Sequence, residues 1–177
     1  MIPIQIIPFP RHRKLKKKLL KKIKKKTDWY HIEHEDDGPD ILGPLTDWDT
    51  YEEDAEWPEY FELFMDEVEE DITDIIQGFG LKSIEYTTCW FQQYHKKYEH
   101  GWHFHGSTLY HAIYFLELPE GTPATLCKFP GGIEFTPNVQ EGDILIIPAI
   151  IEHCSPPNAS DNRKTIIAVN IDEAEDY

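Results

Sequence analysis

The chain has 177 residues, of which 40% are hydrophobic and 13% aromatic, so it is long and apolar enough for one folded domain and is not a disordered protein. No apolar run approaches the roughly 18 residues that a membrane-spanning helix needs. The apolar first ten residues precede the positive charges, which is the wrong order for a signal peptide. The three widely spaced cysteines predict reduced thiols and a cytoplasmic protein.

The charge is unevenly spread along the chain. The net charge is −16, yet eleven of the 17 basic residues lie between Arg11 and Lys26, where there is no acidic residue. The remainder carries six basic residues against 33 acidic ones, and a surface so negative repels nucleic acid and anionic membranes. A nucleic-acid partner is therefore not expected, except through the basic segment.

The first elements in chain order are an extended segment over residues 2–10 and a lysine-rich helix over residues 11–26. Apolar residues recur along this helix at helical spacing and form one narrow stripe: Leu15, Leu19, Leu20 and Ile23. Such a helix either binds nucleic acid or a membrane surface, or docks its stripe onto the core with the lysines facing water or the acidic body. We favour docking, because the stripe is narrow and the body competes for the lysines.

An acidic segment with several aromatic residues, 27–57, is expected to be a structured loop region. Pro58 then opens a second helix that runs to about Gln77, with apolar residues at a period of 3.6 and glycines at its end.

From Leu81 onward the pattern changes to strands. Runs rich in β-branched and aromatic residues, separated by Gly- and Pro-containing turns, predict strands over 83–94, 110–118, 124–129, 133–136, 143–147 and 165–171. Many short strands after two helices indicate a mainly β sandwich or barrel with the helices packed outside. We expect a single domain, 1–177, with a helical support region (1–80) and a β core (81–177).

Three histidines are candidates for a metal site. His103 and His105 stand two residues apart and so project from the same face of a strand, and His153 follows a distant apolar strand. Arg163 comes ten residues after His153, and its planar fork suits a carboxylate. The Thr165 hydroxyl, two residues further on, points to the same face. Each feature is weak alone, but their order along the chain is fairly specific.

These pieces resemble a known family. The stretch from about Cys89 to Ile171 is similar to the double-stranded β-helix (the jelly-roll, cupin-like core) of the iron(II)- and 2-oxoglutarate-dependent oxygenases, above all to a branch found in phages and marine bacteria. The matching pieces are His103-Phe-His105, Ile113-Tyr-Phe-Leu116, Glu141-Gly-Asp-Ile-Leu-Ile-Ile-Pro148, His153, Pro157-Asn-Ala-Ser160 and Arg163-Lys-Thr165.

The resemblance implies a role for each matching residue. His103, His105 and His153 would hold Fe(II), and 2-oxoglutarate would chelate the ion. Arg163 would clamp the distal carboxylate with help from Thr165, and Tyr114 would touch a carboxylate of the co-substrate. The family usually has Asp or Glu where this chain has His105, so the site is one unit more positive than usual.

Two other functions stay open. A cupin-like three-histidine dioxygenase needs no keto acid, and a jelly-roll protein can also be a non-catalytic binding or structural protein. Arg163 argues against the first, and retention of all three histidines with Arg163 argues against the second. The expected substrate is a small molecule or a protein, and a homodimer stays open. A phage origin would place the protein in the host cytoplasm. His100 is expected at the surface or beside a ligand, and His111 in the core.

Overall fold

The computed structural model describes residues 4–24, 30–31, 44–48 and 56–174. These residues contain two helices, α1 (His12–Ile23) and α2 (Glu59–Gly78). The strands are β1 (Gln5–Pro8), β2 (Tyr30–His31), β3 (Leu45–Thr46), β4 (Ile84–Tyr94), β5 (His100–His103), β6 (Tyr110–Glu117), β7 (Leu126–Lys128), β8 (Glu134–Phe135), β9 (Asp143–Pro148), β10 (Glu152–Ser155) and β11 (Lys164–Glu173).

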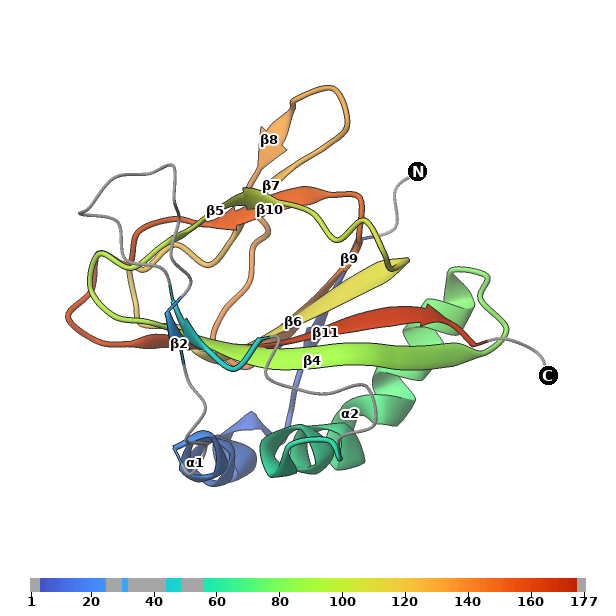
Figure 1. Cartoon of the computed structure of the whole chain (residues 1–177), viewed down its shortest axis with the longest axis horizontal. Helices are drawn as coiled ribbons and strands as arrows, with labels where there is room; N and C mark the ends of the chain where they lie inside the picture. Colours follow the sequence, from blue (N-terminus) through green and yellow to red (C-terminus); the bar gives the residue numbers. More distant parts are fainter. Residues whose placement is uncertain (1–3, 25–29, 32–43, 49–55, 175–177) are drawn as a thin grey trace.

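The strands form two antiparallel sheets that face each other (Figure 1). The larger sheet has the order β1-β9-β6-β11-β4-β3-β2, and the smaller one has the order β5-β10-β7-β8. Both helices cover the outer face of the larger sheet, so the molecule has three layers: helices, large sheet and small sheet (Figure 1). The mainly β fold with helices packed outside is as predicted from the sequence.

The lysine-rich helix docks by its apolar stripe. Leu15, Leu19 and Ile23 are at most 1% exposed and belong to the core between the helices and the large sheet. Lys22 pairs with Glu59 at the start of α2, and Lys16 pairs with Glu141 at 2.6 Å. The prediction that this helix docks its apolar stripe onto the core is therefore confirmed. No helix in the described parts of the chain is long and apolar enough to cross a bilayer.

Helix α2 supplies the other half of the helical layer. Pro58 precedes it in an extended conformation, and Glu59 and Glu62 lie in its first turn, where carboxylates interact favourably with the helix dipole. Its apolar face, from Tyr60 to Ile76, packs on the large sheet. The predicted helix from Pro58 to about Gln77 is thus confirmed within one residue at each end.

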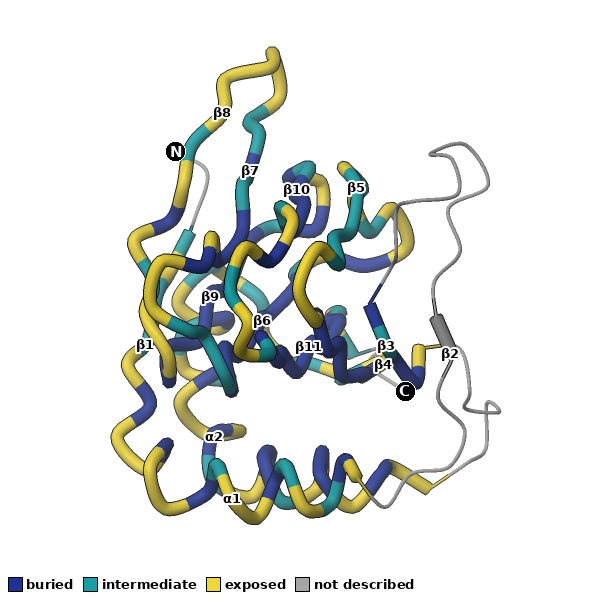
Figure 2. Tube along the Cα trace, turned by 90° about the vertical axis from the view of Figure 1, so that its left-hand side faces the viewer, coloured by how far each residue is buried: buried dark blue, intermediate teal, exposed yellow. Residues whose placement is uncertain are grey.

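A second core fills the space between the two sheets. The central strands β6, β9 and β11 of the large sheet are buried on both faces, because successive side chains alternate between the helical layer and the small sheet (Figure 2). On β11, Ile167 and Val169 face the helices, whereas Lys164 and Ile166 face the small sheet. This alternation decides which polar residues enter the interior between the sheets.

Candidate metal centre

The three predicted histidines lie together. His103 ends β5, His105 lies two residues beyond it, and His153 lies on β10 directly across the antiparallel pair from His103. One ring nitrogen from each side chain lies within 4.8 Å of one from each of the others. A backbone bond from His105 N to Ala149 O, 3.0 Å long, fixes the segment that leaves β5.

The hydrogen bonds of the rings prepare them for a cation. His103 Nδ1 donates to Gly101 O at 2.8 Å, and His153 Nδ1 donates to Ile151 O at 3.1 Å. Since a carbonyl only accepts, each Nδ1 carries the proton and each Nε2 keeps its lone pair. His105 Nε2 is buried and has no hydrogen-bond partner among the described residues. The Nε2 atoms of the three histidines are therefore suitable ligands for a metal ion.

The environment favours the neutral form of two of the imidazoles. Burial, and then repulsion from His103, lowers the pKa of His105 to about 4 and the pKa of His153 to about 3. A neutral imidazole is the form that binds a metal, so His105 and His153 are available as ligands at neutral pH without the release of a proton.

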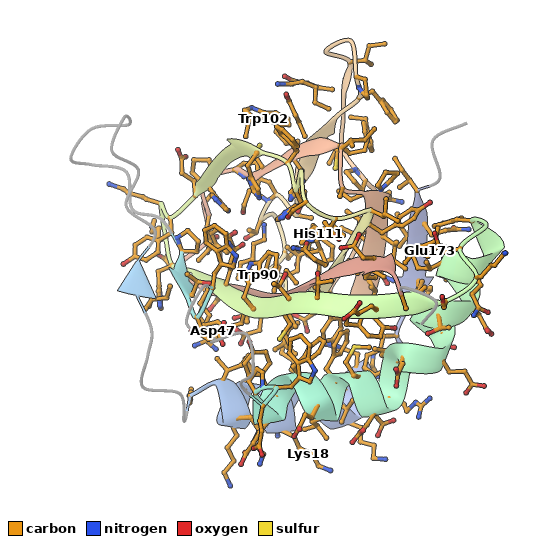
Figure 3. The ribbon with its side chains drawn as sticks, turned by 45° about the vertical axis from the view of Figure 1, so that its right-hand side comes forward. Lys18, Asp47, Trp90, Trp102, His111 and Glu173 are labelled. Carbon is orange, nitrogen blue, oxygen red and sulfur yellow. The ribbon has the colours of Figure 1, made fainter. Side chains whose placement is uncertain are left out.

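A fourth imidazole lies beside the three. The ring centroid of His111, on β6, is 4.1 Å from that of His105 and 5.2 Å from that of His153. Trp90 on β4 stacks on His111 at 5.4 Å, and both side chains lie in the space between the sheets (Figure 3). The sequence suggested a core position for His111. It is indeed 2% exposed, but it also lines the histidine pocket.

A buried lysine also faces this pocket, and the sequence analysis missed it. Lys164 is 1% exposed, and its Nζ donates to Ser155 Oγ at 2.8 Å, to Pro123 O at 3.2 Å and to Ala124 O. Within the described part of the chain it forms no ion pair with a carboxylate. Burial lowers its pKa to about 7. An ammonium group buried without a counter-ion is poised for an anionic ligand.

The structure does not place Arg163 and Thr165, the expected clamp, among the residues that line the histidine pocket. Arg163 Nε and one terminal nitrogen each lie 2.8 Å from Glu117 Oε2, and Thr165 Oγ1 donates to the same oxygen. The alternation along β11 puts Thr165 on the side of Ile167, away from the histidines. The two residues do clamp a carboxylate, as their chemistry suggests, but it is that of Glu117.

Tyr114 is likewise absent from the histidine pocket. It belongs to the core under the helices, stacks on Phe64 at 4.8 Å, and shares a 2.7 Å hydrogen bond between its hydroxyl and His12 Nδ1. On β6 its neighbours His111 and Phe115 face the small sheet, so Tyr114 faces the helices.

The pocket that these side chains line has no carboxylate. Among the described residues its lining consists of Trp90, Gln92, Tyr94, His100, His103, His111, Ile113, Thr125, His153, Cys154, Ser155, Lys164, Ile166 and Ala168. A divalent cation held there by neutral ligands therefore keeps its full charge and, with Lys164 protonated, attracts anions with at least two charges.

Comparisons with known proteins are consistent with this geometry. No protein family model and no curated protein matches the chain. A prolyl-4-hydroxylase from Pseudomonas putida superposes with a TM-score of 0.68 and 14% identity, over 98% of this chain and 94% of that one. The collagen prolyl hydroxylase of Paramecium Bursaria Chlorella virus-1, solved as a 2OG complex, gives 0.67 and 14%, over 97% and 96%.

A third match is more partial. An oxidoreductase of the 2OG-Fe(II) oxygenase family from Burkholderia pseudomallei gives a TM-score of 0.58 and 11% identity over 67% of this chain, which spans 58% of that protein's length. Taken together, these likenesses show that the chain has the double-stranded β-helix fold of the 2-oxoglutarate oxygenase structures.

Proposed function

We propose that the protein is an Fe(II)- and 2-oxoglutarate-dependent oxygenase that hydroxylates its substrate. The observation that carries the proposal is a group of three imidazoles whose ring nitrogens lie within 4.8 Å of one another, two of which, His103 and His153, line one pocket of a double-stranded β-helix together with the buried Lys164. The similar structures include one solved with 2OG, which supports the choice of co-substrate.

The histidines would hold the iron. His103, His105 and His153 each offer one ring nitrogen, and a six-coordinate ion bound to three of them keeps three positions for other ligands. When bound, Fe(II) supplies the oxidative chemistry, in which dioxygen and 2-oxoglutarate yield succinate and carbon dioxide and the second oxygen atom enters the substrate. The residues of the chain orient the reactants and exclude water.

Lys164 takes the role that the sequence suggested for Arg163. Its ammonium group lies in the pocket of the histidines, whereas the guanidinium of Arg163 is satisfied by Glu117. The distal carboxylate of 2-oxoglutarate would replace part of the polar shell of Lys164, close to the hydroxyl of Ser155. A dianion matches this pocket, because it offsets most of the charge of the ion and of Lys164.

Succinate formation from 2-oxoglutarate tests the proposal. Wild-type protein with Fe(II) and oxygen should form succinate, and His153→Ala should abolish it. Removing one partner of a buried charge pair costs about 2–5 kcal/mol, so Lys164→Met should weaken 2-oxoglutarate binding roughly thirtyfold or more in calorimetry.

Two controls make the test specific. Lys128→Met is the same change at a lysine that pairs with Glu152 at 3.1 Å and lies over the Trp102 ring, and 2-oxoglutarate affinity should not change. Arg163→Met should also keep that affinity. Loss of binding in Arg163→Met but not in Lys164→Met would refute the role of Lys164, and failure of the wild-type protein to form succinate would refute the activity.

The cupin-like dioxygenase without a keto acid is the second candidate. The metal-ligand group favours it, because the three residues that gather in the described structure are all histidines and the group includes no carboxylate. The same assay separates the two functions, because this enzyme would bind the metal but show no saturable binding of 2-oxoglutarate.

A further inference from the structure

The outward face of helix α1 carries basic side chains that no described acidic residue neutralises. Three basic residues of this segment pair with acids of the body: Arg11 with Glu67, Lys16 with Glu141 and Lys22 with Glu59. Six others are exposed and form no ion pair with a described residue: Arg13, Lys14, Lys17, Lys18, Lys21 and Lys24. Docking of the apolar stripe on the core therefore leaves these six positive charges in solvent.

The six side chains form one continuous strip, which we call the lysine strip. Because a helix has about 3.6 residues per turn, all six lie on the side opposite the buried stripe of Leu15, Leu19 and Ile23. Lys18 points outward from the helical layer (Figure 3). Neighbours along the strip are three or four residues apart, which a rise of about 1.5 Å per residue makes roughly 5 Å along the axis. The strip therefore suits a partner whose negative charges repeat at regular intervals, as the phosphates of a nucleic acid do.

A membrane surface suits the lysine strip less well. A helix that lies on a membrane buries its apolar face among the lipids, whereas the apolar stripe of α1 is already buried in the core. Helix α2 lies beside α1 on the same side of the large sheet (Figure 1). It exposes a series of carboxylates: Glu62, Asp66, Glu69, Glu70 and Asp74. These carboxylates repel a wide anionic surface, such as a bilayer or a duplex, whereas a single strand is narrow enough to follow α1 alone.

An exposed aromatic side chain lies near one end of the lysine strip. Trp57 precedes α2, is 39% exposed and packs on Phe61 with ring centroids 4.9 Å apart. Lys22 pairs with Glu59, two residues after Trp57, so the chain around Trp57 lies near the C-terminal end of α1. Proteins that bind single strands without sequence preference combine basic residues for the phosphates with aromatic rings on which bases stack.

We propose that the lysine strip and Trp57 form a binding surface for single-stranded nucleic acid. The ammonium groups bind successive phosphates, and the indole stacks on a base, so binding is independent of sequence. This surface lies on the opposite side of the large sheet from the small sheet, which carries His103 and His153 (Figure 1). It therefore attaches the protein to a strand without blocking the metal centre, and it does not depend on the proposed function.

The salt dependence of binding tests the proposal. Fluorescence anisotropy of a labelled oligothymidylate of about 20 nucleotides, titrated with the full chain, measures the affinity. If four of the six basic groups bind phosphates, the logarithm of the association constant falls with the logarithm of the salt concentration with a slope of about −3. The affinity should then fall roughly fiftyfold between about 50 and about 200 mM sodium chloride. Absence of binding at the lower concentration would overturn the proposal.

Lys17→Gln with Lys21→Gln removes two charges from the middle of the lysine strip. The slope should become shallower by about 1.4, and the affinity at low salt should fall roughly tenfold. Lys82→Gln with Lys97→Gln is the matched control, because it removes two charges from exposed lysines outside α1 and gives the same net charge. Its slope and affinity should equal those of the wild type. Equal losses in both double variants would show that only the net charge matters.

Trp57→Leu separates stacking from charge. The affinity should fall roughly fivefold or more, while the slope stays the same, because no phosphate contact is lost. Trp102→Leu is the control, since Trp102 is 40% exposed but lies on β5 of the small sheet, and its affinity should not change. Circular dichroism verifies the fold of each variant.

Two other anionic partners are compared in the same buffer. Tighter binding of a duplex of the same length, or of vesicles that contain phosphatidylserine and phosphatidylcholine in equal amounts, would overturn the choice of a single strand. An unchanged affinity in Trp57→Leu would likewise overturn it, because an anionic partner without bases has no use for the indole.

Discussion

At the scale of single residues, the unpaired charge of Lys164 should be measurable in the stability of the protein. Burial lowers its pKa from 10.5 to about 7, so between these values the unfolded chain holds a proton that the folded protein lacks. The free energy of unfolding therefore rises with pH through this window, and the full cost of burying the ammonium group is present below it.

Lys164→Met removes this dependence of the free energy of unfolding on pH. The free energy of unfolding of the variant minus that of the wild type should decrease by on the order of a few kcal/mol from about pH 7 to about pH 10. Urea unfolding at several pH values measures it, and taking the difference cancels the other titrating groups. Lys128→Met should show no such trend. If the free energy of unfolding changed with pH equally in the wild type and in Lys164→Met, Lys164 would stay charged in the folded protein.

The sequence predicts the placement of some candidate site residues and not of others. His103 and His153 lie together as expected, because each is fixed by its own strand and the two strands pair. The sequence points to Arg163 because a planar fork suits a carboxylate, and it gives no signal for the adjacent Lys164. The choice depended on which of two adjacent residues faces the small sheet, and a shift of one residue reverses every side chain. The pairing of β11 with β6 is irregular between Thr165 and Ile166, and no sequence periodicity reports this.

At the scale of elements, the turn before β9 is joined to the first helix by a close approach. Gly142 has a φ of +94°, and a Cβ placed there would lie 2.9 Å from His12 Cγ. Its carbonyl accepts from Phe9 N at 3.0 Å. His12 in turn bonds Tyr114 and Glu141, so this contact holds α1 against the large sheet.

Gly142→Ala should destabilise the protein by about 2–5 kcal/mol, the sum of a strained backbone and a displaced His12. Gly121→Ala is the matched control, since Gly121 has a φ of +76° with no atom within 4 Å of the added Cβ, and only the strain of about 1–2 kcal/mol should remain. Denaturant unfolding measures both variants. Equal losses would show that His12 moves aside at no cost.

The elements that the sequence predicts well are those with long hydrophobic patterns. Helix α2 and strands β4, β6, β9 and β11 were located within one or two residues. The sequence does not delimit strands β5 and β10. Each is only four residues long, and their sequences, HGWH and EHCS, supply site residues rather than residues that favour a pleated strand. Their pairing brings His103 and His153 together, so the site forms where the propensities are weakest.

At the scale of the whole molecule, the layers separate the basic helix from the pocket. Helix α1 covers the outer face of the large sheet, and strands β5 and β10, which carry His103 and His153, belong to the small sheet on the opposite side (Figure 1). Lys18 points outward from the helical layer, away from Trp90 and His111 (Figure 3). A polyanion bound to the exposed lysines would thus meet the side of the protein remote from the metal centre, which argues against nucleic acid as a substrate.

The same charge distribution should make stability depend on salt. The net charge is −16, and exposed acids of α2 such as Glu70 and Asp74 repel one another and the negative end of the helix dipole. Screening at physiological ionic strength, where the Debye length is about 8 Å, should raise the free energy of unfolding by roughly 1 kcal/mol relative to low salt. Glu70→Gln with Asp74→Asn should reduce this gain, and Lys18→Gln should increase it, in urea unfolding at low and at physiological sodium chloride. An equal salt response in all three proteins would mean that Glu70, Asp74 and Lys18 contribute nothing to the repulsion that salt screens.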